Sequence, residues 1–149
     1  TGETTDLAVM RGIGMAFLDQ VPGTHRLTTV SKLGEVFPLT TTANGKACLA
    51  ALPEKEATKL IRNEWDRNGV KPSTENLFRE LETVRQTGLA YDLDEHASGV
   101  SAIGISFKDW AGELHAISVP VPSSRFARQK PTIERALRET AASIQRSFG

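Results

Sequence analysis

The sequence has one cysteine, Cys48, and no long apolar run. A single thiol forms neither an internal disulfide nor a cysteine-based zinc site, and it fits a reducing compartment. No stretch approaches the roughly 20 apolar residues that cross a bilayer. The first residues also lack the basic and apolar regions of a secretory signal. We therefore expect a cytoplasmic protein with no membrane partner.

An excess of charge is also missing, because eighteen Lys and Arg side chains balance eighteen Asp and Glu side chains. Domains that grip nucleic acid through phosphates usually carry excess positive charge. We therefore expect that residues 1–149 do not bind DNA by themselves. The length is that of a single domain, and the absence of an initiator Met leads us to expect a piece of a longer protein.

Motifs of common enzymes are absent as well. Gly45-Lys46 is similar to part of a phosphate-binding loop, but Thr40 and Ala47 stand where that loop requires Gly and Ser or Thr. The sequence contains no G-x-S-x-G nucleophile elbow. We therefore expect no catalytic residues, no cofactor and no enzymatic activity.

Two side chains leave alternatives open. His96 is close in sequence to Asp92, Asp94 and Glu95, which indicates either a metal site or, as we expect, a solvated acidic loop. Cys48 has apolar neighbours, so it is either a buried structural thiol, as we expect, or a nucleophile beside a histidine. We therefore predict no metal site.

Hydrophobic periodicity predicts strands, then helices, then strands, then a helix. The predicted strands are 5–9 and 13–18, joined by a turn at 10–12, followed by 90–93, 100–107 and 114–121. Residues 27–30 form either a further strand or an extended loop. The predicted helices are 47–52, 53–68, 73–87 and 132–148, with Pro131 at or just before the start of the last one. This order is typical of an α+β fold with a mainly antiparallel sheet.

Two stretches resemble the C-terminal effector-binding domain of IclR-type transcription regulators. The first runs from Phe37 to Pro53 and reads FPLTTTANGKACLAALP. The second contains GLAYD at 88–92, DEH at 94–96, GV at 99–100 and PSSRF at 122–126. The opening TGETTDLAV also resembles the start of that domain. The resemblance implies a GAF-like α+β domain, which is a curved, mainly antiparallel sheet flanked by helices.

The resemblance also implies partners. Members of the family carry an N-terminal winged helix-turn-helix that binds DNA, and that part is absent from residues 1–149. Their effector domain binds a small metabolite, often a carboxylate or an aromatic acid, and the proteins act as repressors or activators. They are usually homodimers or homotetramers. We therefore expect a small-molecule effector and further copies of the chain as partners, and DNA only through the absent domain.

The ligand site is predicted where chemistry and the resemblance coincide. Ala43, Asn44 and Gly45 lead into a predicted helix, and the first N–H groups and the dipole of a helix attract anions. Asn44 donates to a ligand carboxylate, or it only caps the helix. The resemblance adds six residues to the ligand-binding set: Thr29, Phe37, Asp92, Ala102, Ser118 and Pro120.

The predicted site departs from the family in three positions. The resemblance places a small Ser or Ala where Asn44 stands, often a Cys at Ala102, and a small polar residue at Pro120. Asp92 accepts a ligand hydroxyl, orients a water, or bonds to a nearby backbone N–H. Two other functions stay open: a small enzyme acting on a carboxylated metabolite, and a non-catalytic interaction domain with a vestigial pocket.

Overall fold

The computed structural model describes residues 1–25, 35–69 and 74–148. The strands are β1 (Thr5–Arg11), β2 (Gly14–Val21), β3 (Val36–Phe37), β4 (Ala90–Leu93), β5 (Val100–Lys108) and β6 (Leu114–Pro122). The helices are α1 (Ala43–Ala51), α2 (Glu54–Asn68), α3 (Thr74–Thr87) and α4 (Ser123–Ser147). The described strands form one sheet.

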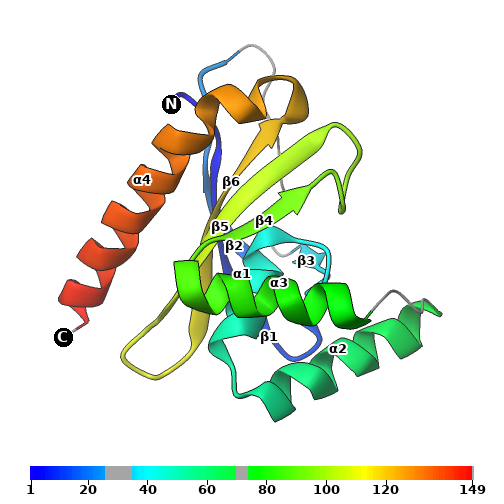
Figure 1. The fold of residues 1–149 in the computed structure, drawn as a ribbon. Coiled ribbons are helices and arrows are strands. Elements are labelled where there is room, and N and C mark those ends of the chain that lie inside the picture. Colours follow the sequence, from blue (N-terminus) through cyan, green and yellow to red (C-terminus); the bar gives the residue numbers. More distant parts are fainter. Residues whose placement is uncertain (26–34, 70–73, 149) are drawn as a thin grey trace.

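The sheet has the order β3-β2-β1-β6-β5-β4, and each neighbouring pair is antiparallel. It is curled, with α1, α2 and α3 on one side and α4 on the other (Figure 1). The predicted α+β class and curved antiparallel sheet are therefore confirmed. Among the described residues, no helix combines the length and the apolar character that crossing a bilayer requires.

The two faces of β5 and β6 carry side chains of different size. Alternate residues point to opposite faces of a strand, and the larger ones pack toward α4. This cluster contains Ile103, Ile105, Ile117, Val119, Val121, Phe126, Ile133 and Leu137. The intervening positions, on the face toward α1, include Ala102, Gly104, Ala116 and Ser118. These small side chains leave room for a helix backbone to approach the sheet.

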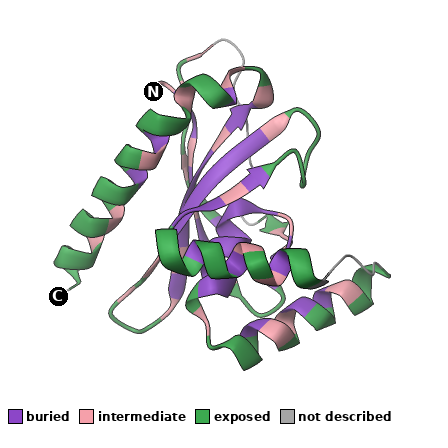
Figure 2. Cartoon of the chain, in the orientation of Figure 1, coloured by how far each residue is buried: buried purple, intermediate pink, exposed green. Residues whose placement is uncertain are grey.

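α1 uses this room. A Cβ atom at Gly104 would lie 3.0 Å from the carbonyl carbon and oxygen of Ala43, and 3.2 Å from the backbone nitrogen of Asn44. Every residue of α1 except Ala51 is buried, and Figure 2 shows the helix enclosed between the sheet and α3. The absence of a side chain at Gly104 therefore sets how closely the first turn of α1 sits against β5.

Several predicted boundaries were wrong, and one strand was missed. β2, predicted at 13–18, runs from Gly14 to Val21. β1 continues to Arg11, so the turn falls at Gly12 and Ile13, because Gly12 supplies the positive φ of 51° that a tight hairpin turn requires. α1 begins four residues earlier than the apolar pattern indicated, at Ala43. The two-residue strand β3 was not predicted, and residues 27–30, predicted as a strand or an extended loop, lie outside the described residues.

The last helix also begins earlier than predicted. α4 starts at Ser123, directly after β6, and Pro131 lies inside it rather than at its start. A proline in a helix interior removes one backbone hydrogen bond and bends the helix. Figure 1 shows the first turns of α4 at an angle to its long remainder. The prediction treated Pro131 as a start signal, whereas the helix accommodates it as a bend.

Gly104→Val tests the approach of α1 to the sheet. The new side chain meets the backbone of Ala43, which cannot rotate away, so we expect a loss of about 1–3 kcal/mol in the free energy of unfolding. Urea denaturation measures this value. Ser106→Val, two residues along the same strand at a half-buried position, is the control. A Gly104→Val protein as stable as the control would show that α1 does not depend on this contact.

Candidate functional site

The first turn of α1 is the centre of the candidate site. Thr42 caps the helix: its Oγ1 accepts a hydrogen bond from the N–H of Gly45 at 3.1 Å and donates to the carbonyl of Pro38 at 2.6 Å. The N–H of Lys46 donates to the Thr42 carbonyl at 3.0 Å. Asn44 therefore does not cap the helix, because Thr42 does, and it lies within the first turn.

Two backbone donors in this turn are left over. The N–H groups of Ala43 and Asn44 precede the first intrahelical bond, and among the described residues neither has an acceptor. Both residues are buried. Unpaired N–H groups at a helix N-terminus, together with the helix dipole, favour an anion. The first turn of α1 therefore offers two main-chain donors next to the small-residue face of the sheet.

Glu64, on α2, fixes the segment that leads into this turn. Its buried carboxylate accepts hydrogen bonds from the N–H of Leu39 at 2.6 Å, the N–H of Thr40 at 3.0 Å and the Thr40 hydroxyl. Bonds to an ionised acceptor are stronger than neutral ones. The loop before α1 is therefore attached to α2 by one side chain.

Gly45 has a packing role in this segment. A Cβ atom there would lie 2.4 Å from the carbonyl oxygen of Leu39 and 2.6 Å from its Cα atom. Contacts this short with a backbone do not occur, so only glycine allows α1 to lie against the preceding loop. Gly45 was predicted to bind the ligand, and the structure supplies a structural reason for glycine at this position.

Lys46 anchors α1 from the other side. Its side chain has no exposed area, and Nζ donates to Glu80 Oε1 at 2.5 Å, to the Tyr91 carbonyl at 3.0 Å and to the Glu95 carboxylate. A buried ammonium group is tolerated only when it is paired in this way. These three bonds join α1 to α3, to β4 and to the loop that follows β4.

Asp92 lies at the end of this network. Its Oδ1 accepts from the backbone N–H groups of Glu95 at 2.8 Å and His96 at 3.3 Å, so the local backbone role is present. Burial raises the pKa of the Asp92 carboxyl above its usual value, although these two hydrogen bonds oppose the shift. Ionisation of this carboxyl group is therefore less favourable in the folded protein than in water.

The strand register places most of the predicted site residues on one face. Asp92 pairs with Ala102, Ala102 pairs with Pro120, and Ser118 pairs with Gly104. Gly104 touches the first turn of α1, so these positions lie on the face of the sheet that Ala43 and Asn44 approach. The Phe37 ring meets the His96 ring edge-on, with centroids 5.5 Å apart, next to the loop that Asp92 holds. Thr29 lies outside the described residues.

Cys48 is not placed to act as a nucleophile. Its side chain is fully buried, and burial raises the pKa of the thiol to about 12. The thiolate is the reactive form, so the thiol is unreactive at neutral pH. The expected buried, structural thiol is confirmed.

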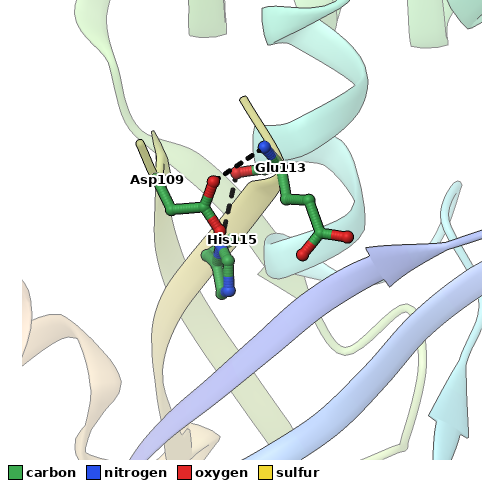
Figure 3. A group of neighbouring side chains, drawn as sticks. All are labelled: Asp109, Glu113 and His115. Carbon is green, nitrogen blue, oxygen red and sulfur yellow. Dashed lines mark hydrogen bonds and ion pairs between the residues drawn. The ribbon is translucent and has the colours of Figure 1, made fainter. Parts of the chain in front are cut away.

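One group of side chains has the composition of a metal site. Asp109, Glu113 and His115 bring one donor atom each to within 4.8 Å of one another. Figure 3 shows Asp109 bonded back to the N–H of Glu113, which closes the β5–β6 hairpin. The Glu113 carboxylate pairs with Arg11 at 2.6 Å, and the His115 ring stacks on Phe107. These contacts account for the cluster without an ion.

A groove lies on the other side of the sheet. It has a volume of about 490 Å³ and lies between α4 and the outer face of the sheet, with Leu7, Phe107, Ile117, Val119 and Leu137 among its apolar walls. None of the predicted ligand-binding residues that the structure describes lines it. The groove and the first turn of α1 are therefore separate features.

Comparison with known proteins identifies the class of this fold. The family model described as "Bacterial transcriptional regulator IclR C-terminal" matches residues 1–146. The HTH-type transcriptional regulator Rv1719 of Mycobacterium tuberculosis is 38% identical over 91% of this chain and 53% of its own length. The HTH-type transcriptional regulator TtgV of Pseudomonas putida is 31% identical over 99% of this chain and 57% of its own length.

A solved structure agrees with these matches. The crystal structure of the Thermotoga maritima IclR superposes on the whole chain with a TM-score of 0.85 at 30% identity, and the match covers 62% of that protein. The fold is thus that of the C-terminal regulatory domain of bacterial transcription regulators. The chain belongs to the IclR family, and it spans a little over half the length of the two curated relatives. Those relatives are named as regulators, not as enzymes.

Sequence reasoning missed Glu64 and Lys46 as parts of the site. Glu64 falls three residues after Ile61 and seven after Ala57, on the buried face of α2. Lys46 is the only charged residue of α1, a helix that is apolar on most sides. A single charge on a buried helix face is the signal that would have identified both.

Glu64→Gln tests the attachment of the loop before α1. The amide keeps one acceptor and turns an NH₂ group toward N–H donors, so we expect a loss of about 1–3 kcal/mol in the free energy of unfolding. Glu56→Gln, on the exposed face of α2, should change stability by less than about 0.5 kcal/mol. Equal urea midpoints for the two variants would contradict the role of Glu64.

Asp92→Asn tests the buried carboxyl group through its pH dependence. Because burial raises the pKa of Asp92, the folded state holds this proton more firmly than the unfolded state. The stability of the wild type relative to Asp92→Asn is therefore greatest below the usual pKa of Asp, about 3.9, and falls as pH rises through the raised pKa. Denaturation curves of both proteins across this range measure the difference. A difference that increases with pH would refute the assignment.

Proposed function

We propose that residues 1–149 are the effector-binding and oligomerisation domain of an IclR-type regulator. A small organic acid binds at the first turn of α1 and modulates DNA binding by an N-terminal winged helix-turn-helix outside these residues. The observation that carries the proposal is the pair of buried N–H groups of Ala43 and Asn44, for which the described residues supply no acceptor. A carboxylate supplies the two acceptors that these donors lack.

The surroundings of the turn support this choice. Ala102, Ser118 and Pro120 lie beside Gly104 on the same face of the sheet, and Asp92 is next to Ala102. The ring of Phe37 contacts the ring of His96 in the loop after β4. Thr29 belongs to the proposed set through the resemblance alone, and Gly45 contributes by letting α1 approach its loop.

The proposed mechanism is a shift between two quaternary arrangements. An effector that binds one arrangement more tightly increases its population, and DNA affinity changes by linkage. The balanced charge of the chain agrees with DNA contact through another domain. We further propose a cytoplasmic homodimer or homotetramer, as the resemblance to the family implies.

Ala43→Pro tests the site, after a thermal-shift screen with keto, hydroxy and aromatic acids has given a hit. A ligand of the folded state raises the melting temperature. Proline fits the first position of a helix but has no N–H, so we expect the variant to fold and to bind the acid about 10- to 100-fold more weakly. Isothermal titration calorimetry measures the affinity.

Ala43→Gly is the matched control, because it keeps the donor while changing the side chain. Unchanged affinity in a folded Ala43→Pro protein would place the acid elsewhere, with the groove beside α4 as the next candidate. If the acid is consumed during the measurement, the result would indicate an enzyme rather than a sensor. If no acid shifts the melting temperature, the proposal fails.

A further inference from the structure

The side chain of Asn44 has a buried oxygen atom without a hydrogen-bond partner. Among the described residues, its Oδ1 is the only buried side-chain oxygen or nitrogen without a hydrogen-bond partner. The residue is 6% exposed. An acceptor that is removed from water and left unpaired opposes folding. An ordered water, an ion or a bound molecule can supply a donor to such a group.

The position of Asn44 indicates what that donor belongs to. Asn44 is the second residue of α1. Its own backbone N–H and that of Ala43 are the two donors that have no acceptor among the described residues. Helical side chains tilt toward the N-terminus of their helix, so the amide lies at the same end as these donors. A molecule bound there meets two donors and one acceptor within a single turn.

We propose that Asn44 selects organic acids with a hydroxyl group on the carbon next to the carboxylate, that is, 2-hydroxy acids. The inference rests on the proposed function and goes further by naming the ligand class. The carboxylate accepts from the N–H groups of Ala43 and Asn44, and the adjacent hydroxyl donates to Oδ1. Unsubstituted acids and 2-keto acids lack this donor, and they leave Oδ1 unpaired.

An amino acid is a poorer match for the same atoms. Its ammonium group also donates, but it brings a second charge into a buried site where the facing acceptor is a neutral amide. Burial of a charge without an ionised partner is more costly than burial of a hydroxyl that makes one hydrogen bond. The neutral donor of a hydroxy acid therefore suits Asn44 better.

The test uses two matched series of acids of nearly equal size. The first is propionate, pyruvate and lactate, and the second is phenylacetate, benzoylformate and mandelate. Calorimetry gives the affinities of the wild type, of Asn44→Ala and of Asn63→Ala, an exposed asparagine on α2 that serves as the control. Melting temperatures without ligand first establish that each variant is folded.

In the wild type and in Asn63→Ala, the hydroxy acid of each series should bind about tenfold more tightly than the other two, as one neutral hydrogen bond predicts. In Asn44→Ala this preference should disappear while the unsubstituted acid still binds, because its donors are main-chain groups. Without ligand, Asn44→Ala should melt no lower than the wild type, since it removes the unpaired acceptor and introduces a better helix former.

The outcomes separate this inference from the proposed function. Equal binding of hydroxy and unsubstituted acids by the wild type overturns the selectivity but leaves acid binding at α1 in place. A preference that survives in Asn44→Ala assigns the acceptor to another residue and also overturns the inference. Binding of none of the six acids refutes the selectivity, whereas the wider acid screen and Ala43→Pro decide the proposed function.

Discussion

The buried carboxylate of Glu64 determines where α1 begins, and the rest of the candidate site depends on that. By holding the N–H groups of Leu39 and Thr40, it fixes the loop that carries the Thr42 cap. The cap satisfies the N–H of Gly45 and leaves those of Ala43 and Asn44 without an acceptor within residues 1–25, 35–69 and 74–148. A contact on α2 therefore decides which main-chain donors are left at the start of α1.

Lys46 complements Glu64 from the opposite end of the same turn. Its three bonds tie α1 to α3 and to the loop after β4, and Asp92 holds that same loop through two N–H groups. The first turn of α1 is thus fixed on both sides by buried polar groups. Preorganised donors of this kind lose little freedom when a ligand binds.

The sequence predicted the order of the helices and strands, and it placed most candidate site residues on one face of the sheet. It was less reliable for the ends of single elements. β4 was predicted with its observed ends, because Ala90 to Leu93 stands between clear helix-ending and loop signals. The start of α1 was missed because Thr42, Ala43 and Asn44 have low apolar periodicity, and a hydroxyl cap set by a distant carboxylate left no local pattern. Pro131 misled the prediction of α4 for the opposite reason, since a strong local signal was overridden by packing.

The same limit applies to the candidate site. The candidate site at Ala43 to Lys46 was predicted from the sequence, but the unpaired Oδ1 of Asn44 depends on contacts that only the folded chain reveals. The alternation of small and large side chains on β5 and β6 affects which substitutions this domain tolerates during evolution. Substitutions at Ala102, Ser118 or Pro120 alter the surface beside α1, while the isoleucine and valine layer under α4 stays intact. Under the proposed function, ligand preference can diverge without loss of the framework, since the candidate site and the α4 cluster lie on opposite sides of one sheet.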